Sequence, residues 1–290
     1  MADKVRSAPT NLAKVRAYYD QTWLDYRIFW FSPGVPAIHF GYWDAATRSH
    51  GEALLRMNRE LADMVDVRAG DRVLDAGCGV GGSAIWLAAS RRAEVVGITP
   101  VASQVARARQ YARRRGVERL VTFEQQDYLA TPYEDASFDV VWAQESVAHT
   151  EHKDAFLAEA FRLLRPGGRL VVVDFFRRGR PYAPPDERQL LQALADWASP
   201  DLSTTGELDE WARQAGFTGI TWRDVTDNVR PSWKRLYLLA LAAYPAGLAM
   251  RSIGMRKPVQ HGNMRGAVNG WRTLQRDLWG ECIMAARKPE

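Results

Sequence analysis

The chain has little cysteine and no long apolar run, and each absence excludes a class of protein. Cys78 and Cys282 are the only two cysteines among 290 residues, too few and too far apart for a disulfide scaffold or a zinc cluster. No apolar stretch approaches the length of a membrane span, and the opening MADKVRSAPT lacks the apolar core of a signal peptide. We therefore expect a cytoplasmic protein that is not stably inserted in a membrane.

The composition indicates one large folded core with an appended cap, or two modest domains. Apolar residues make up 47% of the chain and charged residues 25%, the balance of an ordinary globular protein. A net charge of +5 and an isoelectric point near 9.3 permit nucleic-acid binding without requiring it. Because basic tails and base-stacking motifs are lacking, we expect a small-molecule substrate and no nucleic-acid partner. Self-association into a homo-oligomer stays open.

Histidine is also scarce, which limits the sites at which the protein itself could hold a metal. The chain has five histidines, and His149 and His152 lie close in sequence to Glu145 and Glu151. The spacing of these residues matches no strong ligand signature. We therefore predict no metal bound by protein side chains alone.

Apolar runs of strand length alternate with helical patterns through the first two thirds of the chain. Runs that are apolar on both faces and separated by helices are typical of a parallel sheet with crossover helices on each side, a Rossmann-like α/β fold. The turn RPGGRL at 165–170 predicts a sharp break before the fifth strand, because proline cannot continue a helix. The predicted strands are 72–77, 94–99, 121–127, 138–144 and 169–176, and the predicted helices are 82–90, 102–116 and 153–164.

The pattern changes after the fifth strand. A helix is predicted at 209–216, a strand at 219–225 and a closing strand at 280–287, which brings the strands to seven. The apolar, arginine-rich insertion between the last two strands is too long for a simple loop, so it should form a helical cap. The segments are then an aromatic N-terminal flap (1–68), a core (69–228), the cap (229–271) and the closing strand (272–290).

The stretch VLDAGCGVGGSAIWLA at 73–88 is the most informative part of the chain. A strand runs into a glycine-rich turn and then a helix, so backbone N–H groups at the helix start can approach a cofactor. The glycines satisfy the dinucleotide pattern GxGxxG, which alone is weak evidence. A nicotinamide enzyme places an acid at the end of the second strand, but that strand ends in Thr99 here. The dinucleotide interpretation is therefore disfavoured.

Several motifs resemble the class I S-adenosylmethionine (SAM)-dependent methyltransferases. They are Asp75 before the glycines, Asp127-Tyr128 after the third strand, FDVVWAQESV and LLRPGGRLVVVDFF, and the resemblance runs from about residue 71 to 176. VVGITPVASQV, YYDQT, HFGYW and QESVAH are similar to one branch of that family. The branch holds the tocopherol methyltransferases, the prenyl diphosphate C-methyltransferases and, more distantly, the cyclopropane fatty-acid synthases. The resemblance implies a seven-stranded class I methyltransferase sheet with SAM as cofactor.

The resemblance also implies how SAM would be held. The glycines would line its methionine and ribose portion, and the acid before them would support the turn. A hydroxyl and an amide would hold the ribose, a carboxylate would accept the adenine amino group beside a packed tyrosine ring, and the fourth strand with a flap tyrosine would hold the methionine end. In that order the residues are Gly77, Gly79, Gly81, Asp75, Thr99, Gln104, Asp127, Tyr128, Gln144 and Tyr18 or Tyr19.

Catalysis is predicted at the carboxyl edge of the sheet, where reacting groups gather in open parallel sheets. Glu145 is the first ionisable side chain beyond the fourth strand, and it resembles the base of prenyl diphosphate C-methyltransferases. The alternative is that Glu145 only orients the cofactor or caps the next helix. We also place His149 and Tyr19 in the catalytic set, His149 as a residue near or in contact with the substrate.

The aromatic residues of the flap and the hydrogen-bond donors of the cap indicate the chemical class of the methyl acceptor. Aromatic residues such as Trp23 would shield a cation, while the cap places donors among apolar residues, as an isoprenoid diphosphate requires. Mg²⁺ would then enter only through the substrate diphosphate. We predict C-methylation of an alkene carbon of isopentenyl or geranyl diphosphate; the alternative is N- or C-methylation of an aromatic or alkaloid metabolite. The predicted cap ligands are Arg230, Lys234, Tyr237, Arg256 and His261, and a plain solvent-facing basic surface is their other interpretation.

Overall fold

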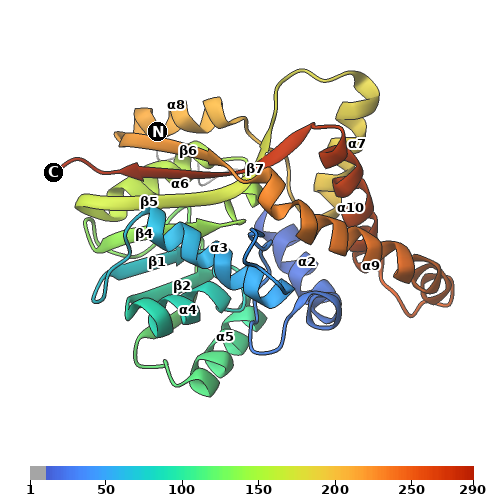
Figure 1. Cartoon of the computed structure of the whole chain (residues 1–290), viewed down its shortest axis with the longest axis horizontal. Helices are drawn as coiled ribbons and strands as arrows, with labels where there is room; N and C mark the ends of the chain where they lie inside the picture. The colour runs from blue at the N-terminus through green and yellow to red at the C-terminus, as the bar shows by residue number, and fades with distance from the viewer. Residues whose placement is uncertain (1–10) are drawn as a thin grey trace.

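A computed structural model describes residues 11–290, and its centre is one seven-stranded sheet (Figure 1). The strand order is β3-β2-β1-β4-β5-β7-β6, with β7 antiparallel to both neighbours and the other adjacent pairs parallel. The predicted fold class is therefore confirmed. The strands are β1 (Arg72–Ala76), β2 (Glu94–Thr99), β3 (Val121–Gln125), β4 (Phe138–Gln144), β5 (Leu164–Arg177), β6 (Thr218–Asp224) and β7 (Trp279–Arg287).

Helices cover both faces of the sheet. Helices α3, α4 and α5 pack on one face, and α6 and α8 pack on the other. The helices are α2 (Leu12–Asp25), α3 (His50–Met64), α4 (Gly82–Arg91), α5 (Ala102–Arg115), α6 (Lys153–Leu163), α7 (Pro184–Asp196), α8 (Thr205–Ala215), α9 (Thr226–Ser252) and α10 (Pro258–Gln275), with a π-helical segment at Tyr26–Trp30 and a 3₁₀ turn at Val147–His149.

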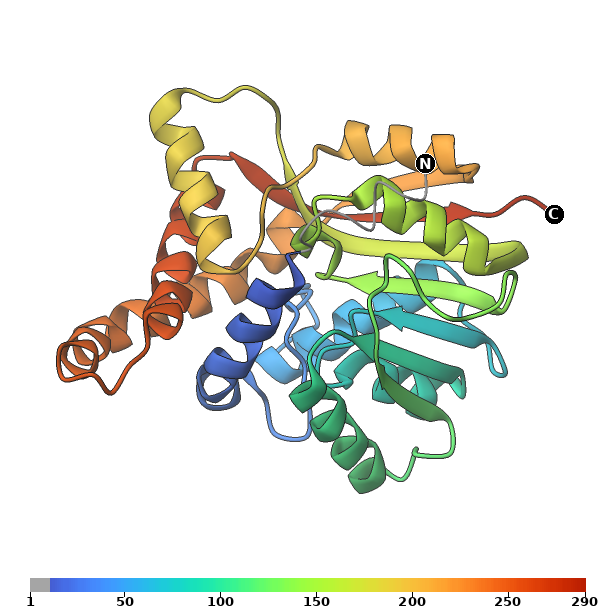
Figure 2. The same ribbon diagram turned by 180° about the vertical axis from the view of Figure 1, so that it is seen from behind.

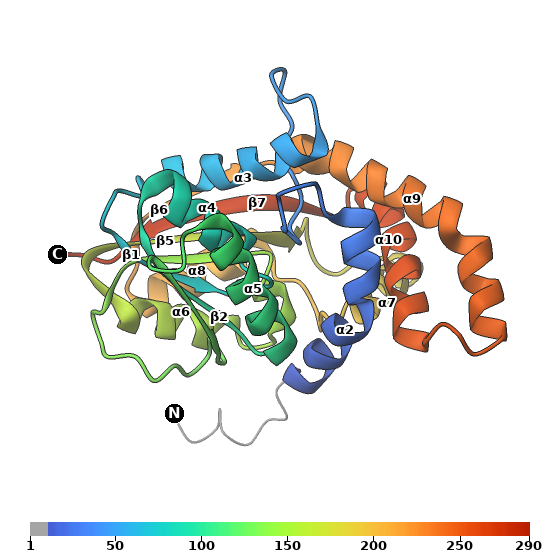
Figure 3. The same cartoon turned by 90° about the horizontal axis from the view of Figure 1, so that it is seen from below.

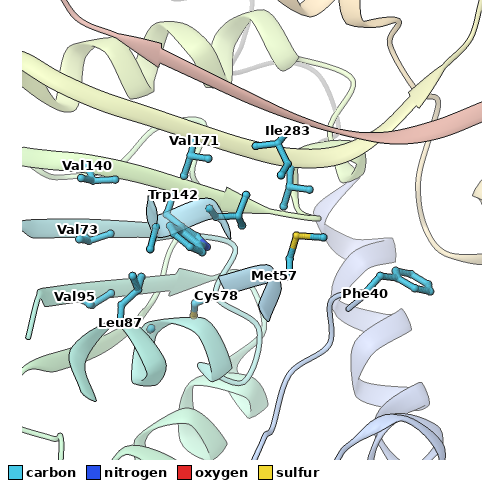
Figure 4. Close-up of a cluster of buried hydrophobic side chains, with 14 of the residues drawn as sticks. Phe40, Met57, Val73, Cys78, Leu87, Val95, Val140, Trp142, Val171 and Ile283 are labelled. Carbon is cyan, nitrogen blue, oxygen red and sulfur yellow. The ribbon is translucent and has the colours of Figure 1, made fainter. Parts of the chain in front are cut away.

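The core has two layers because successive strand residues point to opposite faces. Val73, Val140 and Trp142 face α3 and α4, as Figure 4 shows for the larger layer. Leu74 and Val141, one position along, face α6. Because central strands bury both faces, they read as continuous apolar runs, which is why the sequence located them.

The break predicted at RPGGRL lies within β5 rather than before it. Strand β5 begins at Leu164, which pairs with Phe138, and the register then shifts so that Val140 pairs with Arg169. The additional residues of β5 form a bulge around Gly167, whose φ of +72° an L-residue with a side chain rarely adopts. Proline and glycine here interrupt pairing without ending the strand.

Helix α7 was not predicted, and α3 lies within the predicted helical flap, for which no helix bounds were predicted. Ser49 caps α3, because its hydroxyl accepts the backbone N–H of Glu52 at 3.2 Å. Helix α7 begins at Pro184, a favoured first position. Both signals are local, and both helices lie in segments that the strand pattern did not mark.

Helices α9 and α10 lie between β6 and β7, in the segment predicted as the cap. They form a hairpin that projects beyond the end of the sheet, with α7 packed against α10 (Figure 2). Helix α9 runs through Pro231 and Pro245. The helical hairpin extends the carboxyl edge of the sheet into a wall.

Helix α2 lies against this hairpin at the same edge of the sheet (Figure 3). Asp25 and Arg256 form a two-bonded ion pair across the contact, at 3.1 and 2.8 Å, and Asn263 donates to Asp25 at 3.2 Å. The two charged side chains are 12% and 10% exposed. The pair joins the flap to the cap. The predicted flap, 1–68, begins outside the described residues, which exclude 1–10.

None of the helices within residues 11–290 is long and apolar enough to cross a membrane. Over the same residues, no group of three or more His, Cys, Asp or Glu side chains could hold a metal ion.

One buried carboxyl in β7 is costly to the fold. Glu281 is fully buried, and neither side-chain oxygen has a hydrogen-bond partner within residues 11–290. Burial raises the pKa of Glu281 well above its usual value, and nearby Glu145, Asp174 and Asp224 raise it further. The folded chain therefore binds a proton here that the unfolded chain releases. The stabilising effect of this proton uptake on the folded chain is fully present below the pKa of the unfolded chain, about 4.3. As the pH rises above that value the free energy of unfolding falls, because the unfolded carboxyl can ionise while the buried one cannot do so readily.

We expect Glu281→Leu to stabilise the fold by about 1–3 kcal/mol, since it removes an unpaired buried polar group. The gain should be larger at pH 8 than at pH 5, because the cost of holding the carboxyl neutral grows with pH. Urea unfolding at both pH values measures it. Glu281→Gln is the control that removes the ionisation while keeping the polar shape. Equal gains for Glu281→Leu at the two pH values would contradict the assignment.

Candidate active site

The turn after β1 has a conformation that requires glycine. Gly77 has a φ of +107°, and a Cβ there would lie 2.3 Å from the Cβ of Ser146. Gly81 has a φ of +84°, and a Cβ there would lie 2.6 Å from the Phe123 ring. Gly81 caps α4, so the unpaired N–H groups of the first helical turn face the carboxyl edge of the sheet.

The flap loop closes over this turn, as expected for the aromatic N-terminal segment. The carbonyl oxygen of Pro36 would lie 2.6 Å from a Cβ on Gly82, and the Ile38 side chain 3.5 Å from a Cβ on Gly79. The glycines thus admit the flap backbone as well as a cofactor. A cofactor bound at the turn would be covered by residues that precede the sheet in sequence.

Polar groups predicted to hold a cofactor lie at the ends of β2 and β3. The Thr99 hydroxyl donates to Oε1 of Gln104 at 2.6 Å, and both side chains are buried. This bond orients the Gln104 amide from α5 toward the strand ends. Asp127 accepts the backbone N–H of Leu129 through one oxygen, and the Tyr128 hydroxyl donates to the Ser146 carbonyl at 3.0 Å.

Two buried polar atoms at the turn have no partner among residues 11–290. One is Oδ2 of Asp75, where burial raises the pKa of the carboxyl to about 7. The other is Nε2 of Gln144, whose Oε1 accepts from Ser83 at 2.8 Å and from Trp142 at 3.2 Å. Unpaired buried donors and acceptors are rare in folded proteins. Their place beside the glycine turn fits a polar cofactor that would supply the partners.

One cavity of about 410 Å³ joins the glycine turn to the flap and the cap. It brings together every residue predicted to hold the cofactor except Gly81, and also the three predicted catalytic residues. The lining residues from those sets are Tyr18, Tyr19, Asp75, Gly77, Gly79, Thr99, Gln104, Asp127, Tyr128, Gln144, Glu145 and His149.

A phenol and an imidazole form a pair in the cavity wall. The Tyr19 hydroxyl lies 3.0 Å from Nε2 of His149, and Nδ1 of His149 lies 3.3 Å from the Ala198 carbonyl. Because a carbonyl only accepts, Nδ1 carries the proton and Nε2 accepts from Tyr19. Burial lowers the pKa of His149 and raises that of Tyr19 well above its usual value. At neutral pH the pair is a neutral base bonded to a protonated phenol.

Glu145 lies directly after β4, with a φ of +50° that turns its side chain out of the sheet. The Phe40 backbone N–H donates to its Oε1 at 2.6 Å. Burial raises the pKa of Glu145 well above its usual value, and the Phe40 N–H offsets part of this effect. The carboxyl therefore holds a proton more tightly than an exposed glutamate does.

Helix α9 forms the apolar wall of the cavity. Small and apolar residues recur at helical spacing and face inward, and the one lysine or arginine lining the cavity within the described chain is Arg256. Its charge is already matched by Asp25. The lining residues of α9 are Leu236, Leu239, Ala240, Ala243, Ala246, Gly247 and Met250.

The other predicted substrate ligands lie outside this cavity, and their placement corrects the prediction of a cationic cap wall. Arg230 pairs with Asp227 at 3.2 Å, and Lys234 is exposed. Tyr237 stacks on Trp271. His261 is buried, with Nε2 3.4 Å from the Tyr244 hydroxyl, and Trp23 lies beneath the Arg107 guanidinium. In a helix, only the residues on the inward stripe reach the cavity, and these side chains are off it.

Three residues outside the predicted set of site residues also shape the site: Phe40, Asp25 and Asn263. Asn263 accepts the Tyr18 hydroxyl at 2.7 Å, and Tyr18 also bonds Tyr26 at 2.8 Å. Phe40 stacks on Trp233 at 4.2 Å between ring centroids. The Tyr18–Asn263 and Phe40–Trp233 contacts join positions more than 190 residues apart, so no local pattern in the sequence marks them.

The chain matches the methyltransferase domain family over residues 74–172. The 27-O-demethylrifamycin SV methyltransferase of Amycolatopsis mediterranei (strain S699) is 38% identical over 201 residues, covering 68% of this chain and 72% of that protein. The chloroplastic tocopherol O-methyltransferase of Arabidopsis thaliana is 30% identical over 221 residues, 70% of this chain and 64% of that protein.

Solved structures agree over nearly the whole chain. The (4+2)-cyclase SpnF has a TM-score of 0.80 at 30% identity and covers 97% of this chain and 98% of its own. A geranyl diphosphate C-methyltransferase from Streptomyces coelicolor A3(2) has a TM-score of 0.73 at 18% identity, with coverage of 97% and 98%. At that identity the second match shows the fold alone.

The chain belongs to the class I SAM-dependent methyltransferases, whose domain model it matches and whose sheet and glycine turn it carries. SAM is its methyl donor, and it is a small-molecule methyltransferase of natural-product biosynthesis.

We expect Gly77→Ala to abolish measurable binding of SAM and of its demethylated product. The new methyl group would collide with Ser146 in addition to straining a positive φ. Gly70→Ala is the matched control, since Gly70 has a φ of +85° but nothing lies within 4 Å of a Cβ there. Isothermal titration calorimetry measures binding. Parental affinity in Gly77→Ala would contradict the placement of the cofactor at this turn.

Proposed function

We propose that this enzyme methylates a hydroxyl oxygen on an uncharged, largely apolar natural product. The observation that carries the proposal is the cavity itself. It joins the cofactor turn to an apolar helix stripe and contains a neutral imidazole–phenol pair. Its one lining arginine or lysine in the described part of the chain, Arg256, already has a carboxylate partner.

The residues present divide the work of an O-methylation. Bound SAM supplies a methyl group already activated for transfer, so the protein mainly aligns the acceptor and excludes water. The Tyr19 hydroxyl already donates to Nε2 of His149, so the acceptor hydroxyl would donate to the Tyr19 oxygen. As the methyl–sulfur bond breaks and the methyl–oxygen bond forms, the acceptor proton would pass to Tyr19 while the proton of Tyr19 passes to Nε2 of His149. The Ala198 carbonyl holds the opposite nitrogen in the protonated form, and Tyr19 orients the acceptor oxygen beside the imidazole.

Two relatives whose names specify methylation of oxygen support the choice of a hydroxyl acceptor, while others, such as the 24-methylenesterol C-methyltransferase 2 of Arabidopsis thaliana, are named for methylation of carbon. The 38% identical relative acts, by its name, on 27-O-demethylrifamycin SV. Another relative, from Penicillium expansum, is an O-methyltransferase that is 35% identical over 199 residues. These names motivate the choice of test acceptor.

C-methylation of isopentenyl or geranyl diphosphate is the second candidate, and Glu145 is the observation that favours it. A buried carboxyl with a raised pKa suits removal of a proton from a carbocation. The diphosphate, however, needs converging cations. Arg256 is paired, and Arg230 and Lys234 point elsewhere. The aromatic or alkaloid acceptor of the N- or C-methylation alternative needs no such cations and fits the same apolar wall.

The test offers both acceptor classes to the enzyme with SAM labelled with ¹³C at the methyl group. We expect a mass gain of one methylene on 27-O-demethylrifamycin SV or a comparable apolar alcohol, and a ¹³C shift typical of a methoxy group. Geranyl diphosphate with Mg²⁺ should remain unchanged. Label on carbon of geranyl diphosphate would overturn the proposal in favour of the second candidate.

We expect His149→Gln to lower kcat by about 10²–10⁴-fold, the usual contribution of a general base, without changing SAM affinity. His152→Gln is the matched control at a neighbouring histidine. Because burial lowers the pKa of His149, the parent should lose activity only below the ordinary histidine value of about 6.5, as the imidazole gains a proton. If Glu145→Gln abolishes turnover while His149→Gln does not, Glu145 is the base.

We expect Arg230→Ala and Lys234→Ala to leave kcat/KM for an apolar alcohol acceptor within about twofold of the parent, since exposed charges contribute little. Steady-state kinetics on the acceptor identified above measure this. A tenfold or larger loss would place these side chains at the acceptor and revive the diphosphate interpretation.

A further inference from the structure

The exposed large apolar side chains of the described chain are not scattered evenly over its surface. Three lie on the flap and six on the α9 helix and the turn that follows it, and one lies on α7. In that order they are Leu24, Ile28, Phe29, Leu238, Leu241, Leu248, Met250, Ile253, Met255 and Leu191. Contiguous exposed apolar surface on a soluble protein usually marks a binding site.

Four of these residues also line the active-site cavity: Leu24, Ile28, Phe29 and Met250. They are 52%, 59%, 39% and 39% exposed. Such residues belong both to the cavity and to the outer surface, so they mark its mouth. We call them the lip residues. The flap and the helical hairpin that carry them lie side by side in Figure 3.

An ion pair fixes the position of the flap relative to the helical hairpin, and so fixes the distance between the lip residues of the two elements. The Asp25–Arg256 pair joins the two elements directly beside the mouth, and its side chains are about as buried as a core ion pair. Breaking such a pair leaves an uncompensated buried charge and is strongly unfavourable. The lip residues therefore stay exposed although the flap and the cap are already in contact. An open flap that has yet to dock on the cap does not explain their exposure.

The size of the cavity also indicates that part of a large acceptor would lie outside it. Its volume of about 410 Å³ includes both the cofactor turn and the α9 wall, and pockets of about 300–1,000 Å³ hold a single drug-sized ligand. With SAM in place, little room remains behind the mouth for a second large molecule.

We propose that the lip residues form an outer acceptor subsite, which holds an extended apolar portion of an acceptor too large to be enclosed. The inference rests on the proposed function for the identity of the occupant. The reacting hydroxyl would enter the cavity, and the apolar body would lie between the flap and the end of α9. The enzyme would then select acceptors by their apolar length or bulk as well as by the group that is methylated.

The same helix offers an internal comparison. Leu238, Leu241 and Leu248 are exposed on another side of α9 and do not line the cavity. Leu241 is 40% exposed, about the same as Met250 at 39%. If apolar exposure on α9 served only a second copy of the chain or a membrane surface, the outer leucines should matter as much as the lip residues.

The test measures binding and needs no turnover, so it remains informative if the methylated atom is different. The probes are 4-ethylphenol, 4-butylphenol, 4-hexylphenol and 4-octylphenol, which share a neutral hydroxyl and differ in apolar length. They compete with the fluorescent probe N-phenyl-1-naphthylamine in the presence of demethylated SAM. We expect Kd to fall about fourfold per added methylene while the chain contacts the lips, the fold-change that corresponds to about 0.8 kcal/mol.

The variants are Ile28→Ser and Met250→Ser, one on each lip, with Leu241→Ser as the matched control. Both lip variants should weaken 4-octylphenol binding at least tenfold and leave 4-ethylphenol within twofold, while the control keeps the parental dependence on length. Thermal unfolding verifies that each variant is folded.

Parental length dependence in both lip variants would overturn the proposal. Analytical ultracentrifugation and pelleting with phosphatidylcholine vesicles would then identify a second copy or a membrane surface as the occupant. Failure of the proposed function has a different signature, namely no methyl transfer to an alcohol despite length-dependent probe binding.

Discussion

The buried ion pair between Asp25 and Arg256 is the interaction on which the active site most depends. Asp25 ends the N-terminal helix α2 and Arg256 follows the long cap helix α9, so the pair joins segments that six of the seven strands separate in the sequence. Around it, Asn263, Tyr18 and Tyr26 form a continuous set of hydrogen bonds. Most of these polar groups satisfy one another, with Nε of Arg256 left without a partner within residues 11–290, and together they fix one geometry. The cavity is the space that remains between the elements they hold.

Local sequence patterns account for the sheet well and for the cap less well. Central strands such as β4 bury both faces and read as continuous apolar runs, and the glycine turn is constrained by backbone geometry at Gly77 and Gly81. Helix α9 lacks such a signature because it carries two internal prolines and exposes leucines on its outer side. Its boundaries depend on packing against α10, which only the folded chain supplies.

The candidate site likewise contains residues whose positions the sequence could predict and residues whose positions it could not. Residues at a strand end or just beyond it, such as Thr99, Asp127 and Glu145, are placed by the sheet, so their proximity could be predicted from the order of the strands. The cap residues could not be placed, because a helix presents one side to the cavity and a cluster of basic residues does not reveal which side. Arg256 faces inward and Arg230 does not. The contribution of the flap loop, through Phe40 and Ile38, depends on contacts between distant segments.

The inward side of α9 is built largely from Ala240, Ala243, Ala246 and Gly247. Space for the acceptor is therefore created by methyl groups and a hydrogen where longer side chains would fit the same helix. These positions lie on α9, whereas the residues predicted to hold the methyl donor lie mainly at the ends of β1 to β4. If those roles hold, the residues that select the acceptor and the residues that bind the donor belong to separate parts of the chain, so the first set can be changed while the second stays constant.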